Sequence, residues 1–297
     1  MAKRNLIIGA TQNYDIDKLK PWVLSAKEVN TDTNTFDVVL CYSNTSEETL
    51  NWLKEQGVIT IPMAMFNVNH IPIHVLRFMT IYDYLKSNYA KYNCVLTTDV
   101  KDVYFQKNPF DYLDSINVGV GKSGPKLIAS SESLRYKDEP WGDQNLKQTY
   151  GQYVYDLNKN NTIYNVGVFA GVPEYVKDLA FNIFTNSVGR PIPIVDQAVY
   201  NVLIQTQPYK DVVGFLPQST GWAVQLGTTG DPTKMEYFRP NLLESEPFFD
   251  YNDGLVKTFD RQVFHIVHQY DRVPDWKKLV QKKYGQDDEE QFFTYKV

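Results

Sequence analysis

Two aspartates, Asp99 and Asp102, follow a short apolar run at residues 94–96 within a few residues. Such a run predicts a buried strand, and side chains at the carboxyl end of a strand in a parallel sheet face the crevice where ligands bind. Carboxylate oxygens are the ligands that Mg²⁺ and Mn²⁺ prefer, and a substrate diphosphate supplies further oxygens to the same ion. The pair therefore predicts a divalent-metal site. The alternative is that Asp99 caps a turn and Asp102 pairs with a surface lysine.

Strands and helices that would position these carboxylates alternate through about the first hundred residues. Apolar runs predict strands at residues 6–10, 36–42, 58–61 and 94–96. Apolar residues at helical spacing predict helices between successive strands, and Thr45 with Glu48 forms a capping-box pattern before a helix that Gly57 would end. This alternation predicts a largely parallel sheet covered on both faces.

The second half of the chain is less regular. Strand-like runs lie at residues 118–120, 163–169, 212–215 and 264–267, with helical stretches near 174–185 and 196–205. The segments 121–140 and 217–258 are rich in Gly, Pro, Ser, Asp and Asn, and loops of that length in a compact domain are usually functional. We therefore expect a mixed α/β fold with long loops around the site.

Composition narrows the class of protein. The chain has 297 residues, is 43% hydrophobic and carries a net charge of -5 without basic clusters, which argues against a nucleic-acid partner. Cys41 and Cys94 both lie in apolar runs and are expected to be buried thiols. Neither a signal peptide nor a transmembrane segment is predicted, so we expect a soluble, cytoplasmic protein.

The stretch at residues 94–110, which ends in Pro109-Phe110, resembles the Asp-x-Asp region of GT-A glycosyltransferases. There, a hydrophobic strand also runs into acidic residues. Three further motifs follow in the order of that family: residues 163–171 look like its Asn-Ala-Gly-Val segment, residues 195–197 like its Asp-Gln motif, and residues 264–272 like its late His-containing segment. The pattern is most similar to glycogenin-like and plant cell-wall glycosyltransferases, and it covers roughly residues 5 to 275.

This resemblance implies a fold and a reaction. The fold is a single GT-A domain over residues 1–297, with a Rossmann-like, mostly parallel central sheet flanked by helices, a smaller mixed β region and long active-site loops. Residues 1–110 would form the nucleotide-binding half, and residues 111–285 the acceptor and sugar-binding half. The reaction moves a hexose from a nucleotide-diphosphate sugar, by default a UDP-sugar, to a glycan or glycoprotein acceptor with Mn²⁺ or Mg²⁺; a GDP-sugar stays open.

The resemblance also implies the metal ligands, with one departure from the family. The family's carboxylates are separated by one residue, whereas two residues separate Asp99 from Asp102. Counting back from Pro109-Phe110 makes Asp102 the principal ligand, and Asp99 then binds the ribose or completes the metal shell. His268 is favoured over His265 as the third ligand, because it lies where the late strand should end.

The remaining candidate residues bind the donor or take part in the transfer. The donor-binding candidates are Thr11, Asn13, Arg77, Asp99, Asn165 and Arg272, and the catalytic candidates are Asp196, Gln197 and Asp143. Arg77 could instead pair with Asp83 on its helix, and Arg272 could form a surface ion pair. If the enzyme inverts, Asp143 or Asp196 is the base. If it retains, no base is needed and Asp196 with Gln197 would line the sugar; the resemblances at residues 163–171 and 195–197 favour retention. Trp141, expected in a polar loop, could stack on an acceptor sugar or be partly buried.

Two other readings of the sequence remain open. A sugar-nucleotide nucleotidyltransferase has a related sheet with metal-bound aspartates, but it usually carries a Gly-rich basic loop after the first strand, which residues 11–14 lack. A catalytically degenerate sugar-binding GT-A domain would bind its ligand without turnover.

Overall fold

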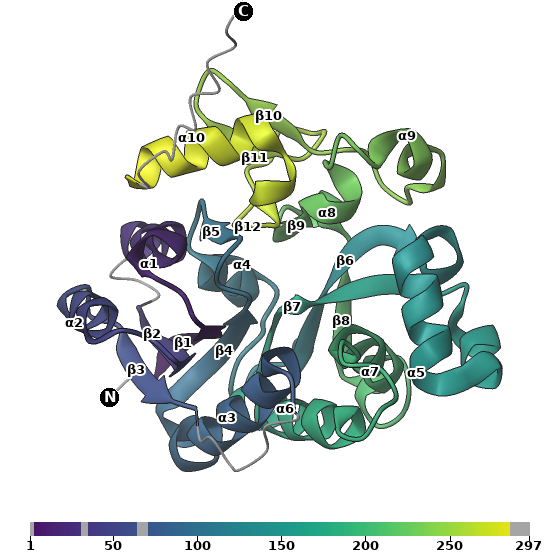
Figure 1. Ribbon diagram of the computed structural model, residues 1–297, viewed down its shortest axis with the longest axis horizontal. Coiled ribbons are helices and arrows are strands. Elements are labelled where there is room, and N and C mark those ends of the chain that lie inside the picture. The colour runs from purple at the N-terminus through teal and green to yellow at the C-terminus, as the bar shows by residue number, and fades with distance from the viewer. Residues whose placement is uncertain (1–2, 31–34, 64–70, 286–297) are drawn as a thin grey trace, which may run out of the picture.

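A seven-stranded sheet forms the centre of the molecule, with helices on both faces (Figure 1). The computed structural model describes residues 3–30, 35–63 and 71–285. The strand order is β3-β2-β1-β4-β7-β6-β8. These strands are β1 (Arg4–Gln12), β2 (Phe36–Ser43), β3 (Ile59–Pro62), β4 (Tyr92–Thr98), β6 (Leu127–Arg135), β7 (Thr162–Gly171) and β8 (Val213–Leu216).

Most neighbouring strands of this sheet run parallel. Parallel pairing joins β3 to β2, β2 to β1, β1 to β4 and β6 to β8. Strand β7 runs antiparallel to both of its neighbours, β4 and β6. The expected mostly parallel α/β sheet is therefore confirmed, and β7 is its reversed strand.

Alternate residues of β1 belong to two different cores, because successive side chains of a strand point to opposite faces. Leu6 and Ile8 pack with α3 (Ile73–Asn88), α6 (Pro173–Ser187) and α7 (Asp196–Ile204). Ile7 packs on the other face with α1 (Ile16–Val29), α2 (Glu47–Glu55) and α4 (Pro109–Ser115). The neighbouring strand β4 is buried on both faces in the same way, with Val95 in the first core and Leu96 in the second, and it ends just before Asp99.

A smaller mixed sheet lies beyond the end of β4, as expected. Its strands are β5 (Val103–Phe105), β12 (Ile266–His268) and β9 (Ala223–Gln225), in the order β5-β12-β9. His268 is the register partner of Val103 on β5 and of Gln225 on β9. The small sheet thereby brings the late segment of the chain next to the turn that carries Asp102.

The remaining elements are short or peripheral, apart from α5. They are α5 (Pro140–Asn158), α8 (Leu226–Thr229), α9 (Met235–Phe238), α10 (Pro274–Tyr284), the hairpin of β10 (Phe248–Asp250) and β11 (Leu255–Lys257), and the 3-10 helices η1 (Tyr89–Lys91), η2 (Tyr136–Asp138), η3 (Tyr209–Asp211), η4 (Gln218–Thr220), η5 (Arg239–Asn241) and η6 (Tyr270–Arg272).

Several local expectations are wrong. Ser46, not Thr45, caps α2, since its side chain accepts a hydrogen bond from the Thr49 amide; Gly57 does follow the helix, with φ +81°. Residues 118–120 lie in a loop and not in a strand. The predicted loop at 121–140 contains the nine-residue strand β6, and 217–258 contains β9, α8, α9 and the β10–β11 hairpin. Trp141 lies in the first turn of α5, not in a loop.

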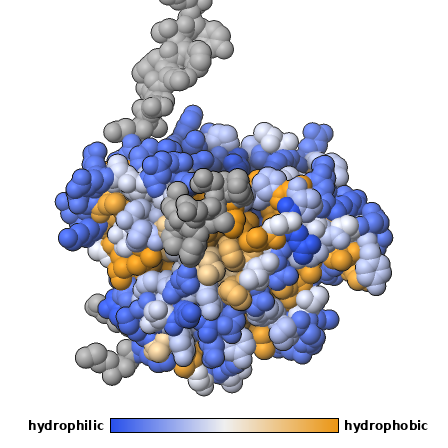
Figure 2. Space-filling view, turned by 60° about the horizontal axis from the view of Figure 1, so that its bottom comes forward, coloured by the Kyte–Doolittle hydropathy of each residue, from blue (hydrophilic) through white to orange (hydrophobic). Residues whose placement is uncertain are grey.

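The surface and the buried thiols agree with the composition. Hydrophilic side chains cover most of the face in Figure 2, and hydrophobic ones are interspersed among them, as on most protein surfaces. Cys41 and Cys94 are buried free thiols. In the described part of the chain, no helix has the length and apolar character needed to cross a bilayer.

Candidate active site

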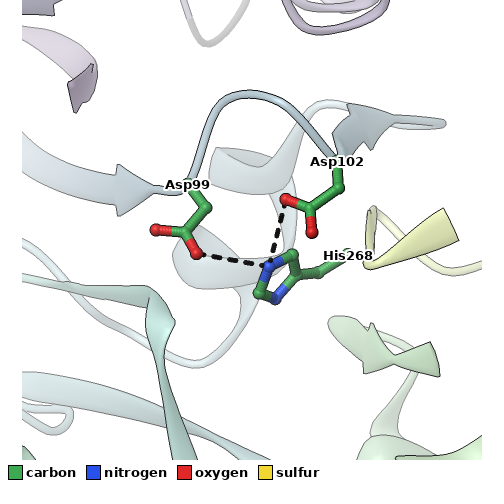
Figure 3. A group of neighbouring side chains, drawn as sticks. All are labelled: Asp99, Asp102 and His268. Atoms are coloured by element: carbon green, nitrogen blue, oxygen red, sulfur yellow. Dashed lines mark ion pairs between the residues drawn. The ribbon is translucent and has the colours of Figure 1, made fainter. Parts of the chain in front are cut away.

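Asp99, Asp102 and His268 form a cluster at the carboxyl end of β4 (Figure 3). The aspartates lie on the turn between β4 and β5, and the histidine ends β12. The His268 Nε2 atom is 3.5 Å from both Asp99 Oδ2 and Asp102 Oδ1. One ligand atom from each residue lies within 4.8 Å of the others, so the extra residue between the aspartates does not keep them apart.

Gln225 orients the His268 ring. The Gln225 Oε1 atom is 2.6 Å from His268 Nδ1, and the Gln225 Nε2 group donates to Ser130 Oγ at 3.1 Å. Because an amide oxygen only accepts, Nδ1 must carry the proton and donate it, which turns Nε2 toward the carboxylates, where it can hold either a second proton or a metal ion. A second residue that fixes the tautomer in this way is typical of metal-binding histidines.

The charges of the cluster favour a bound cation. Burial disfavours the charged imidazole, but Asp102 and then Asp99 outweigh it and raise the pKa of His268 to about 10. Burial also opposes ionisation of Asp99, but Arg77 and His268 hold its pKa well below the usual range. Two carboxylates that face one imidazole nitrogen favour a proton on it, and the same donor set suits a divalent metal ion.

Gly167 on β7 allows the cluster to close. A Cβ atom at this position would lie 2.6 Å from Asp99 Oδ2 and 2.7 Å from His268 Cε1, closer than side chains approach. The Gly167 carbonyl also accepts a hydrogen bond of 2.7 Å from the Asp99 amide. This glycine, which belongs to the segment at residues 163–171 that resembles the family's Asn-Ala-Gly-Val motif, therefore leaves room for two of the candidate ligands.

Arg77 joins the cluster to α7. Its guanidinium donates to Asp99 and, at 3.0 Å, to Asp196 Oδ2, and it lies 4.7 Å from the ring centre of Phe78. The alternative pairing with Asp83 is wrong, because Arg77 points into the site. Burial raises the pKa of Asp196 although Arg77 acts in the opposite direction. Asp196 is thus a buried carboxylate held by a charged hydrogen bond.

Glu132, which the sequence reasoning missed, lies at the centre of a second polar network. It accepts hydrogen bonds of 2.7 Å from both Asn165 Nδ2 and Gln197 Nε2. The two amide oxygens in turn accept from the backbone amides of Gly167 and Val166. Burial, and then the charge of Glu139, raise the pKa of Glu132 to about 7. The sequence offers one indication of this residue, a single Glu between Ser131 and Ser133, but that position lies in the segment that was predicted to be a loop.

Two cavities meet at the cluster, and both are lined by His74, Arg77, Asp99 and Arg272. The smaller, about 290 Å³, extends over the end of β1, where it is also lined by Thr11, Gln12, Tyr14, Lys101, Asp102 and Asp271. The larger, about 740 Å³, includes Glu132, Glu139, Trp141, Asn165, Asp196, Gln197, Asp231, Lys234 and His268. Together they form a polar cleft with the cluster between its two halves.

Two predicted residues, Asn13 and Asp143, and the disfavoured His265 do not line this cleft. Asn13 is exposed and accepts a hydrogen bond from Asn44, while its neighbour Thr11 lines the smaller cavity. Asp143 accepts from Tyr155 and, at 2.6 Å, from Lys147 on its own helix. The disfavoured His265 is bonded through Nδ1 to the Asn108 carbonyl. The structure therefore does not bring Asn13 or Asp143 together with the other candidates.

Trp141 and Arg272 lie at the rim. The Trp141 side chain is 51% exposed and lines the larger cavity. The Arg272 side chain is 47% exposed and lines both cavities, and its one ion pair with a described residue is a long contact of 3.7 Å to Asp271. Both side chains are free to contact a ligand.

Comparison with solved structures shows the fold. No protein-family model matches the sequence, and no curated protein matches it either. The apo structure of the bifunctional glycosyltransferase WbbM is similar at a TM-score of 0.55 and 12% identity, over 96% of this chain and 52% of that one. The galactosyltransferase LgtC, solved with donor and acceptor sugar analogs, is similar at a TM-score of 0.54 and 15% identity, over 93% of this chain and 95% of that one.

This chain has the GT-A glycosyltransferase fold that the sequence motifs suggest. It spans about half the length of WbbM and nearly the whole of LgtC. At these identities the similarity extends to the fold alone, and the activity must be argued from the site.

Proposed function

We propose that this protein is a divalent-metal-dependent glycosyltransferase that moves a hexose from a nucleotide-diphosphate sugar to a carbohydrate acceptor. The observation that carries the proposal is the cluster of Asp99, Asp102 and His268, with Gln225 fixing the tautomer of the histidine. It lies between two polar cavities at the strand end where this fold class binds ligands.

The smaller cavity suits the nucleotide diphosphate. Arg272 and Lys101 supply positive charge at its rim, and Thr11 and Tyr14 offer a hydroxyl each beside the end of β1. Mn²⁺ or Mg²⁺ on the cluster would neutralise the charge that develops on the departing diphosphate. Uridine is our proposed base, on the sequence resemblance.

The larger cavity suits the transferred sugar. Glu132 holds the amides of Asn165 and Gln197 in fixed orientations, so the second N–H of each amide can donate to a sugar hydroxyl without reorganising. Neither predicted base is free: Asp196 is ion-paired with Arg77, and Asp143 lies outside the cavity. This arrangement favours retention over inversion.

The acceptor would enter past Trp141. An indole that is half exposed at the mouth of a polar cavity offers an apolar face on which the C–H face of a sugar ring can pack. We therefore assign the rim of the larger cavity, from Trp141 to Lys234, to a glycan or a protein-linked glycan.

Calorimetric titration of UDP-glucose, UDP-galactose and GDP-mannose, each with Mn²⁺ and with EDTA, tests the proposal. One donor should bind only with the metal, and Asp102→Ala should abolish that binding. Asp83→Ala, which removes an exposed carboxylate on α3, is the matched control and should bind like wild type. Failure of every donor to bind under both conditions would contradict the proposal.

A further inference from the structure

A third cavity, of about 400 Å³, lies where the ends of β6 and β7 meet β8 and the carboxyl end of α7. It shares no lining residue with the two cavities at the metal cluster. Its volume falls in the range of small-molecule sites. Tyr164 lines this cavity, whereas the next residue, Asn165, lines the larger cavity at the cluster. Strand β7 thus separates the two, since successive side chains point to opposite faces.

The cavity is lined by positive charge, and no carboxylate is among its described lining residues. Arg135 and Lys210 are its only charged lining residues, and within the described part of the chain neither forms an ion pair. Glu244, whose charge acts on Tyr164, accepts hydrogen bonds from Ser131 and Ser219 instead. An anionic group in the cavity would meet two cations with donors still free.

Two aromatic rings form an apolar part of the wall. The centroids of Tyr164 and Phe215 are 4.8 Å apart, with the rings inclined at 47°. Both side chains are half-buried and line the cavity. Rings held in this way lose little freedom when a ligand packs on them, and they suit the C–H face of a sugar ring.

Side-chain amides complete the wall. Among the described residues, Asn160 makes no side-chain hydrogen bond, and Gln205 Nε2 makes only long ones, of 3.4 Å to Thr162 O and 3.5 Å to Asn201 Oδ1. An amide side chain can donate twice and accept twice, so both residues retain capacity for hydroxyl groups.

From these three features we infer that this cavity binds a saccharide unit that carries an anionic group, either a carboxylate or a phosphate. Arg135 and Lys210 bind the anion, Tyr164 and Phe215 pack against the ring, and Asn160 and Gln205 bind its hydroxyls. The site is separate from the proposed transfer site, and its occupancy does not depend on metal or donor.

Saturation-transfer NMR and calorimetry with D-glucuronate, glucose 6-phosphate, glucose and inorganic phosphate test this inference on the full chain with EDTA present. One or both anionic sugars should bind, and glucose and phosphate should bind about tenfold more weakly or not at all. The two anionic sugars distinguish the carboxylate from the phosphate. Excess UDP should not displace them.

Lys210→Gln and Arg135→Gln should each weaken that binding about tenfold. Both side chains are exposed, so the variants are expected to fold. Lys54→Gln, which removes an exposed charge on α2, is the matched control and should bind like wild type. Equal binding of glucose, equal binding of inorganic phosphate, no binding at all, or unchanged binding by both variants would each overturn the inference, whatever the outcome for donor binding.

Discussion

Replacing Gln225 with leucine tests how the metal cluster is built. The substitution removes the acceptor of the His268 Nδ1 proton and leaves all three proposed ligands in the chain. Without that acceptor, the ring is no longer held in the tautomer that presents Nε2 to Asp99 and Asp102. Gln225 is completely buried, so water cannot readily take the place of its amide.

Loss of a residue that orients a metal-binding histidine typically weakens metal affinity 10- to 100-fold. We expect Gln225→Leu to lose Mn²⁺ affinity by that factor, which corresponds to about 1.4–2.7 kcal/mol. Electron paramagnetic resonance of free Mn²⁺, followed during a titration with protein, measures the dissociation constant directly.

The matched control is Gln218→Leu. Gln218 is also buried, and its amide donates to the Ser245 carbonyl away from the cluster. Both variants should lose stability, but only Gln225→Leu should lose metal affinity. Wild-type Mn²⁺ affinity in a folded Gln225→Leu protein would refute the assignment of His268 as a ligand oriented by Gln225.

Three further predictions concern the cleft. The pKa of Glu132 is about 7 in the folded chain, against an ordinary value of 4.5, so the folded protein binds more protons than the unfolded chain between these pH values. The free energy of unfolding should therefore fall by up to about 3 kcal/mol as pH rises from below 4.5 to above 7. Urea unfolding at pH 5 and pH 8 should show a smaller change in that free energy for Glu132→Gln than for wild type. Gly167→Ala should lower Mn²⁺ affinity at least about tenfold because its Cβ would displace Asp99 and His268, and an unchanged titration would contradict that geometry. Trp141→Ala should leave stability and donor affinity unchanged and weaken acceptor binding by about 0.5–1.5 kcal/mol; equal losses in donor hydrolysis and in transfer to acceptor would count against a role in acceptor binding.

The local sequence pattern was enough to predict the strands and helices of the central sheet where apolar side chains are buried on both of its faces. The first strands and helices show the expected spacing because each packs an apolar face on the sheet, as Ile7 does with α1. The proposed ligands could be named from the sequence because each follows an apolar run that predicts a strand. Asp99 and Asp102 follow residues 94–96, and His268 follows residues 264–267. Arg77 could be named as a site residue. Only the fold, however, shows that it pairs with Asp99 and Asp196 and not with Asp83 on its own helix.

Strand β6 shows why the rest could not be predicted. Its buried polar residues have distant partners: Ser130 accepts from Gln225, and Thr228 donates to the Glu132 carbonyl. Such a strand has no apolar alternation, so its composition indicates a loop. Glu132 was missed for this reason, and Gln225 because it ends the three-residue strand β9 inside a segment that was predicted to be a loop. The hydrogen bond from Tyr155 to Asp143 could not be predicted either, because Tyr155 lies twelve residues further along the same helix.

The most direct test of the central claim is donor turnover. Wild-type protein incubated with the donor that binds and Mn²⁺ should release nucleoside diphosphate, slowly to water and faster with an added glycan acceptor. Release should stop with EDTA and in Asp102→Ala, and it should persist in Asp83→Ala. Metal-dependent donor binding without any release of nucleoside diphosphate would contradict the claim and indicate a GT-A domain that only binds sugar nucleotides.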